Sequence, residues 1–390
     1  MTLLFPGLVV YSPVGRRERI VDMSIARSSM GLLALAAASH LALAGPGASY
    51  DVRLAIQSRN ADQIQYRGVP LVNDISGGTI GLHPHDGPHL IAGDPTFYTR
   101  HQAELIKDIN DTIADVNFSG VICIDHESWW PSWEWSSHVQ PAWTNYIKTQ
   151  RPELLAGKPD TEWDAIIQAQ YKATVRQYYE FTANIVRQQR PKAKLSWYGI
   201  PLRSYWIFNG VPQYGVDLAR YREIHGEEMR WYFDLVDVLC PSIYPVYSVA
   251  SPPGPNQVEP AGNEAYILGM VGESVRVSRG KPVYPFFMLK YHPSSGAYAN
   301  QFINPINLRQ GLEIPRQVGA AGLAIWDFFY DEQELAAWQS YYDTTARDVI
   351  YGVIYPGTGS APTALSGSPT EPEPGEDQSV SPDGRVEKKP

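Results

Sequence analysis

The sequence of 390 residues has little of what marks several common classes of protein. It contains only two cysteines, Cys123 and Cys240, too few for a small domain held together by disulfides. Lys and Arg number 32 against 41 Asp and Glu, so we expect no nucleic-acid partner. No apolar run is long enough for a convincing membrane span. Both cysteines lie within apolar runs, which predicts buried thiols, although a single bridge between them stays open.

The two ends of the chain differ in composition from the body. Residues 1–44 contain Arg27, then an apolar stretch over 31–43, then small residues at 42–44, which is typical of a secretory leader. This predicts a secreted protein, with Met1 and Met23 as alternative starts. Residues 356–390 are rich in Pro, Ser and Glu and predict a disordered tail. Residues 45–355 remain as one domain.

Apolar runs and helical stretches alternate along this domain. The strand-like runs are VPLVND (69–74), GVICID (120–125), KLSWYGI (194–200), VDVLCPSIY (236–244), PVYPFFMLKY (282–291) and AGLAIWDFF (321–329). Between them lie helical segments, of which 162–190 has an apolar face at the helical period and ends before Pro191. Strands with polar residues at their C-terminal ends favour an α/β fold, a distorted TIM-type β/α barrel. An open doubly wound sheet is the alternative.

Two acids follow the run VICI. Because side chains alternate along a strand, Asp125 and Glu127 share one face with Cys123, whereas His126 points to the other. Two neighbouring carboxyl groups raise one pKa, which keeps a carboxylic acid protonated for general acid catalysis. A pair on one strand does not place a second carboxylate across the scissile bond. It suits a substrate whose own 2-acetamido group is the nucleophile.

Aromatic residues gather at the ends of the other strand runs. Trp129 follows the acid pair, Tyr198 ends KLSWYG, Tyr244 ends CPSIY, and Trp326 precedes Asp327. Sugars stack on aromatic rings and bond to hydroxyl and carboxyl groups, so this rim predicts a carbohydrate cleft.

These motifs resemble the hyaluronidases, glycoside hydrolase family 56, over residues 117–342. NFSGVICIDHESWWPSW resembles the family's Asp-x-Glu strand, and LSWYGIP, VLCPSIY, PVYPFFMLKY and GAAGLAIW follow in the family's order. The resemblance implies a barrel that hydrolyses β-linked N-acetylhexosaminides with retention and without metal. It implies Glu127 as proton donor and Asp125 as the residue that positions the acetamido group.

The same resemblance implies a subsite formed by Tyr198, Tyr244 and Trp326, and it carries Trp129 in the family's Trp-x-Pro continuation. The chain departs from the family at Trp130, at 202–205 and at 327–329, and it lacks the usual disulfides. No counterpart of the first strand is found before residue 70. The cleavage point is therefore expected to be retained and the polymer-binding cleft altered, which leaves hyaluronan, chondroitin and a neutral N-acetylglucosamine polymer as substrates. We expect a monomer without cofactor.

Two rival hypotheses remain. The sequence His83-Pro84-His85-Asp86 resembles the His-x-His of metal-dependent amidohydrolases, which need further histidines at later strand ends. His225 and His292 do not supply them clearly, so a polar loop is the preferred interpretation. The second hypothesis is a barrel that binds glycans without cleaving them.

Overall fold

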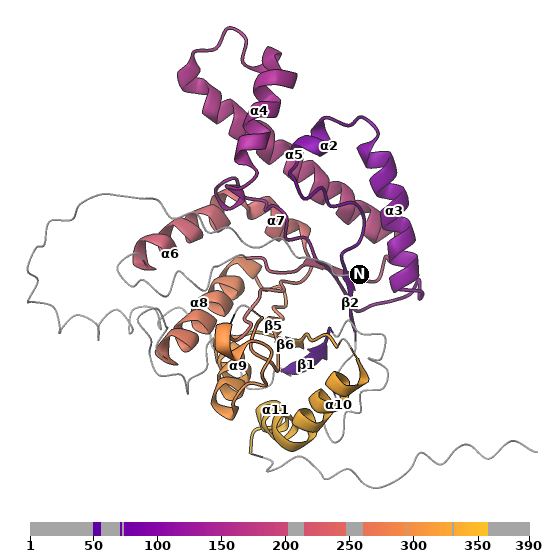
Figure 1. The fold of residues 1–390 in the computed structure, drawn as a ribbon, viewed down its shortest axis with the longest axis vertical. Helices are drawn as coiled ribbons and strands as arrows, with labels where there is room; N and C mark the ends of the chain where they lie inside the picture. Colours follow the sequence, from indigo (N-terminus) through magenta and orange to yellow (C-terminus); the bar gives the residue numbers. More distant parts are fainter. Residues whose placement is uncertain are drawn as a thin grey trace, which may run out of the picture. The chain divides into compact units, whose positions relative to one another are not determined.

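The computed structural model describes residues 50–55, 71, 74–201, 214–246, 260–293, 295–329 and 331–357 (Figure 1). The predicted leader over 1–44, the departure at 202–205 and the predicted tail beyond residue 357 lie outside these ranges. Within them, no helix combines the length and the apolar character that a bilayer span requires.

Short parallel strands form the centre of the described part. They are β1 (Asp51–Leu54), β2 (Ile75–Gly78), β3 (Val121–Ile124), β4 (Lys194–Trp197), β5 (Phe286–Phe287) and β6 (Gly322–Ile325). They form two sheets, ordered β1-β6-β5 and β2-β3-β4. Isolated parallel bridges from Tyr198 to Cys240 and from Ser242 to Phe286 join the sheets through the segment between β4 and β5. The ring therefore runs from β2 to β1 through seven strand segments.

The ring is a distorted β/α barrel, as predicted. On its remaining side no backbone ladder joins the described residues of β1 and β2. Instead Arg53 of β1 forms an ion pair with Asp74, which immediately precedes β2. Arg53 also pairs with Asp51 at 2.9 Å and lies over the ring of Tyr284 at 4.4 Å from its centroid. Among the described residues, side-chain contacts thus link β1 to the start of β2, whereas backbone hydrogen bonds join the strands within each sheet.

The first two strands correct the sequence interpretation. β1 lies before residue 70, where no strand was expected, and β2 begins just after the predicted run 69–74. Both were hard to find because DVRL and ISGG are short and not continuously apolar. Gly77 has a φ of +124°, and a Cβ there would lie 2.4 Å from the carbonyl oxygen of Cys123. Glycine is therefore required for β2 to approach β3 this closely.

Helices surround the strands. They are α2 (His89–Ala92), α3 (Phe97–Thr112), α4 (Gln140–Gln150), α5 (Asp160–Gln189), α6 (Tyr214–Glu223), α7 (Arg230–Leu235), α8 (Pro260–Ser278), α9 (Pro305–Val318), α10 (Glu332–Tyr341) and α11 (Arg347–Ile354). The long helix α5 ends before Pro191, as predicted. Its predicted apolar face is buried at Ile167, Tyr171, Val175 and Tyr178, whereas Phe181 is half-buried.

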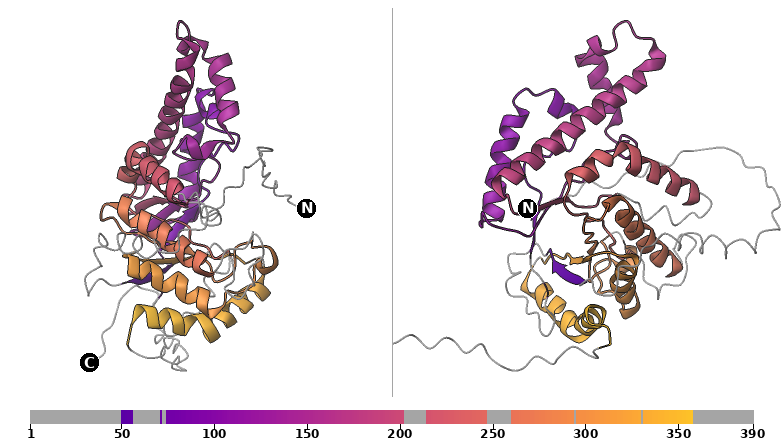
Figure 2. Two further views of the ribbon diagram at one scale, coloured as in Figure 1. Left: turned by 90° about the vertical axis from the view of Figure 1, so that its left-hand side faces the viewer. Right: turned by 180° about the vertical axis from the view of Figure 1, so that it is seen from behind.

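Two outer cores and one inner core stabilise the barrel. Helices α3, α4, α5 and α7 pack on the outer faces of β3 and β4, and helices α8 to α11 pack around β1, β5 and β6. The views in Figures 1 and 2 show these two groups of helices on opposite sides of the strands. A third cluster fills the interior with residues from the strand segments, including Val121, Cys123, Cys240, Phe286 and Ala324.

Candidate active site

A cavity of about 550 Å³ opens at the carboxyl ends of the strands, where β/α barrels place their active sites. Each strand segment of the ring contributes to it through a residue at or just after its C-terminal end. The lining includes Ala55, Ser76, Gly77, Gly78, Cys123, Asp125, Glu127, Tyr198, Tyr244, Phe286, His292, Trp326 and Phe328. Of the predicted site residues, Asp125, Glu127, Tyr198, Tyr244 and Trp326 meet here.

The acid pair lies just beyond the end of β3. Strand alternation continues past Ile124, so Asp125 and Glu127 line the cavity together with Cys123, as predicted. Burial raises the pKa of Asp125, and the interaction with Glu127 acts in the opposite direction. Loss of surrounding water, followed by the charge of Asp125, raises the pKa of Glu127 to about 7. Glu127 is nevertheless exposed to the cavity, so it can hold a proton at neutral pH where a ligand can reach it.

One oxygen of the acid pair lacks a partner. Oδ1 of Asp125 is buried and accepts no hydrogen bond from any described residue. An unsatisfied carboxylate oxygen in such a place is costly unless a ligand satisfies it. The site therefore offers an acceptor for an N–H or O–H group that a ligand brings.

Three aromatic rings form a stack along the cavity wall, and this stack begins beside the acids because Tyr198 follows β4, the strand paired with β3. The ring centroids of Tyr198 and Tyr244 are 5.9 Å apart at an interplanar angle of 26°. Those of Tyr244 and Trp326 are 5.7 Å apart at 29°. Burial raises the pKa of both tyrosines far above the ordinary value, so their hydroxyl groups remain donors. Such a wall combines apolar ring faces with hydroxyl groups, which is the surface that a sugar requires.

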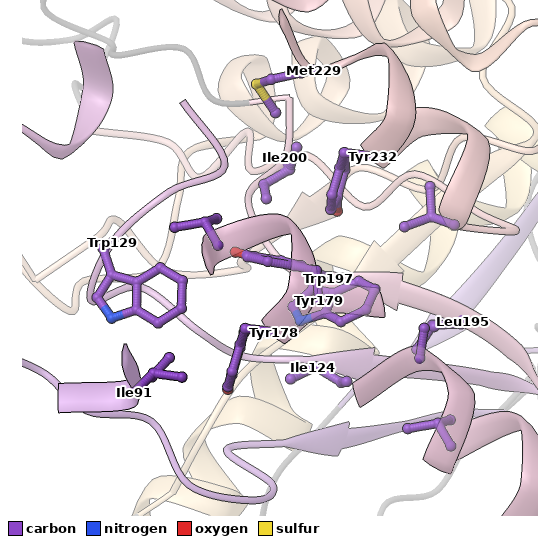
Figure 3. Packing of buried hydrophobic residues seen from close by; sticks show 14 of the residues in the cluster. Ile91, Ile124, Trp129, Tyr178, Tyr179, Leu195, Trp197, Ile200, Met229 and Tyr232 are labelled. Carbon is purple, nitrogen blue, oxygen red and sulfur yellow. The ribbon is translucent and has the colours of Figure 1, made fainter. Parts of the chain in front are cut away.

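Two residues expected at this rim lie elsewhere. Trp129 is fully buried in the outer core (Figure 3), and its Nε1 donates to the carbonyl oxygen of Pro84 at 2.9 Å. The chain turns after Glu127, so strand alternation no longer describes position 129. Asp327 is also fully buried. It pairs with Lys290 at 3.3 Å and accepts from Nε1 of Trp338 at 2.9 Å, on the side opposite Trp326.

The two cysteines are buried free thiols. Cys123 and Cys240 lie in the inner core beneath the cavity, and burial raises the pKa of Cys123 well above its ordinary value. The structure therefore agrees with two unreactive thiols and shows no bridge between them.

Histidines gather beside the acid pair more closely than the sequence suggested. His126 points away from the cavity that Asp125 and Glu127 share with the aromatic wall, as predicted. Its ring packs against Trp129, with ring centroids 4.3 Å apart. His83 and His85 belong to the loop after β2, and His138 lies just before α4. No group of three or more His, Cys, Asp or Glu among the described residues has the arrangement to hold a metal ion. The amidohydrolase hypothesis therefore finds no support in this loop.

The sequence interpretation also missed two residues of the first cavity. His292 stacks on Tyr244 with centroids 6.0 Å apart, and Phe328 lies beside Trp326 at 5.4 Å. His292 directly follows the run 282–291, and Phe328 lies at the end of the run 321–329, so both positions near the C-terminal ends of strand-like runs were the available signal.

The fold and the acid pair together define a β/α-barrel protein with the site architecture of a carbohydrate-active enzyme. Comparison with known proteins makes this specific, because the hyaluronidase family model matches residues 91–353. The chain belongs to this family, glycoside hydrolase family 56, as a divergent member.

The relatives are distant. Hyaluronidase-1 of Homo sapiens is 25% identical over 296 residues, which are 70% of this chain and 63% of that protein. A chondroitin hydrolase of Caenorhabditis elegans is 25% identical over 234 residues, 58% of this chain and 48% of that protein. The chain thus spans less than two thirds of the length of either. The crystal structure of bee venom hyaluronidase aligns with a TM-score of 0.61 at 18% identity, covering 77% of this chain and 99% of that one.

Proposed function

We propose that this protein is a secreted, retaining endo-β-N-acetylhexosaminidase of the hyaluronidase type. Its substrate is a glycosaminoglycan such as hyaluronan or chondroitin, and its nucleophile is the substrate's own 2-acetamido group. The observation that carries the proposal is the pairing of a proton donor, Glu127, with a buried and unpartnered acceptor, Oδ1 of Asp125, in one cavity. Membership of the hyaluronidase family supports the same chemistry.

In the first step Glu127 donates its proton to the glycosidic oxygen while the bond from that oxygen to the anomeric carbon breaks. The carbonyl oxygen of the acetamido group forms the new bond to the anomeric carbon. The acetamido nitrogen gains positive character, and its N–H donates to Oδ1 of Asp125. The carboxylate thereby orients the nucleophile and stabilises the charge.

In the second step a water molecule attacks the anomeric carbon and gives its proton to the Glu127 carboxylate. The bond to the acetamido oxygen breaks, and the amide is restored. Two displacements on opposite faces leave the anomeric configuration as it was. Tyr198 and Tyr244 donate hydrogen bonds to the sugar from the aromatic wall, and Trp326 packs against the acetamido methyl group.

The structure gives different support to two alternative functions. A barrel that only binds glycans has no use for a carboxyl group with a pKa of about 7 in an accessible cavity. A hydrolase acting on a neutral N-acetylglucosamine polymer has the same acid pair. It receives support from the cavity lining, which contains no Lys or Arg among the described residues.

The test is to incubate the purified full chain with hyaluronan, chondroitin and N-acetylglucosamine oligosaccharides and to identify the products. Internal cleavage of an acidic polymer, with the β-anomer formed first in proton NMR spectra, is the expected result. An unsaturated terminal sugar would indicate a lyase and refute the mechanism. Glu127→Gln provides the matched control, because it keeps the shape of the donor and removes its transferable proton.

A further inference from the structure

A second cavity of about 410 Å³ lies on the far side of the acid pair. Its lining is Thr79, His83, His85, Asp125, His126, Glu127, Ser128 and His138. The two cavities have only Asp125 and Glu127 in common. A glycan that passes the acid pair would therefore leave the aromatic cavity and enter one whose lining contains four imidazole rings.

The deeper part of this second cavity is a fixed chain of hydrogen bonds. Nε2 of His83 lies 2.6 Å from the carbonyl oxygen of Ile80, so it must carry a hydrogen. Nδ1 of His83 is then an acceptor, and Nδ1 of His126 donates to it at 2.8 Å. Burial lowers the pKa of His83 to about 4 and that of His126 well below the ordinary value. These two rings are therefore neutral and form the floor of the cavity.

The rim of the second cavity is different, because its two histidines are exposed. His138 donates from Nε2 to the carbonyl oxygen of Ser128. His85 forms a hydrogen bond through Nδ1 with the hydroxyl group of Ser128. In each ring the second nitrogen makes no hydrogen bond to a described residue. Ser128, next to the proton donor, thus holds two imidazole rings in place with one nitrogen of each facing solvent.

Charge narrows the choice of ligand. Neither lining contains Lys or Arg among the described residues, so imidazole is the group in these cavities that can carry positive charge. A protonated imidazole donates a charge-assisted hydrogen bond to a carboxylate, which is stronger than the bond it makes to a hydroxyl group. An acidic sugar therefore gains more than a neutral sugar at this rim.

From this arrangement we infer that the histidine-lined cavity binds the sugar on the leaving-group side of the scissile bond and that His85 and His138 select a sugar bearing a carboxylate. The inference rests on the proposed function, because it takes the aromatic cavity as the acetamido subsite. With the acetamido sugar held by Asp125 and the aromatic wall, the sugar beyond Glu127 lies among the histidines. The two rim histidines are then specificity-determining residues for an acidic polymer over a neutral one.

The experiment compares a hyaluronan oligosaccharide with its carboxyl-reduced counterpart of the same length, in which each uronate has become a neutral glucose. The full chain is expected to prefer the acidic oligosaccharide in kcat/KM. In the double variant His85→Gln/His138→Gln the preference should fall about tenfold, the scale of one charge-assisted hydrogen bond. His85→Arg/His138→Arg places a permanent positive charge at both positions and should retain the preference.

The control variant is His89→Gln, because His89 lies nearby at the start of α2 but lines neither cavity. Circular dichroism and thermal unfolding establish that all variants fold. An unchanged preference in the glutamine double variant, or equal losses for both oligosaccharides, overturns the inference.

Binding of both oligosaccharides, measured by calorimetry on Glu127→Gln, tests the same selectivity without turnover. A wild-type chain that fails to hydrolyse any polymer refutes the proposed function instead.

Discussion

His83 and His126 face each other through their Nδ1 atoms, which are 2.8 Å apart in a buried place beneath the acid pair. One hydrogen between the two Nδ1 atoms forms a hydrogen bond that joins the rings, whereas a hydrogen on each Nδ1 would make the two atoms repel each other. The floor of the second cavity therefore depends on both rings remaining neutral. This gives the histidines a measurable influence on stability.

We predict that the free energy of unfolding decreases as the pH falls from about 6.5 to about 4. The pKa of His83 is about 4 in the folded chain against an ordinary value of about 6.5 when unfolded, so the unfolded chain binds more protons in this window. The contribution of the neutral histidine to the free energy of unfolding is fully present above the unfolded pKa of about 6.5 and is lost as the pH falls toward the folded pKa of about 4. Urea unfolding at several pH values measures the effect. His126→Phe should flatten the dependence, since a phenyl ring suits the surrounding Trp129 and Tyr178.

Activity, in contrast to stability, should be lost as the pH rises. Because the pKa of Glu127 is about 7, kcat/KM should fall as the pH rises above that value and the donor loses its proton. Asp125→Asn removes the neighbouring negative charge, so the alkaline limb should move to lower pH as the overall rate drops. A limb that stays in place in this variant would contradict the assigned coupling.

Loss of the proton donor should nearly abolish hydrolysis. Glu127→Gln is expected to lower kcat by roughly 10²–10⁴-fold, the usual contribution of general acid catalysis. The amide retains the shape of the side chain, so thermal unfolding at neutral pH should show a folded protein. Residual turnover near the wild-type rate would mean that another group protonates the leaving oxygen.

Removing the hydroxyl group of Tyr198 in the aromatic wall should lower kcat/KM, whereas removing that of Tyr179 in the outer core should not. Tyr198→Phe is expected to reduce kcat/KM about tenfold, because one hydrogen bond to the sugar is lost. Tyr179→Phe is the matched control, since its hydroxyl is buried in the outer core without a partner among the described residues. Steady-state kinetics on both variants should separate them, and equal losses would argue against the assigned wall.

A packing prediction tests the fold itself. A Cβ on Gly311 of α9 would lie 2.1 Å from the ring of Phe287 in β5, whereas one on Gly272 of α8 would meet nothing closer than 3.7 Å. Gly311→Ala should destabilise the protein by about 1–3 kcal/mol through overpacking. Gly272→Ala should be neutral or stabilise it by up to about 1 kcal/mol, because alanine favours the helix. Chemical denaturation of the two variants decides the point.

The sequence predicted those parts of the site that a single strand determines. Asp125 and Glu127 follow a strand whose alternation fixes their common face, and Tyr198 and Tyr244 follow similar strands. The alternation did not extend to Trp129, because the chain turns there and buries the indole in the outer core. The histidine-lined cavity was not predicted because it is assembled from separate loops, one after β2, one after β3 and one before α4. Only tertiary structure brings such residues together.

Among the described residues, β1 and β2 are joined by side chains and not by a backbone ladder. There, Arg53 and Asp74 hold the ring together through opposite charges, and electrolyte weakens attraction between charges more than it weakens a backbone ladder. We expect the two sheets to separate first along this seam when ionic strength rises. The cavity lined by Asp125 and Glu127 would then change shape at the β1–β2 edge before the surrounding helices unfold.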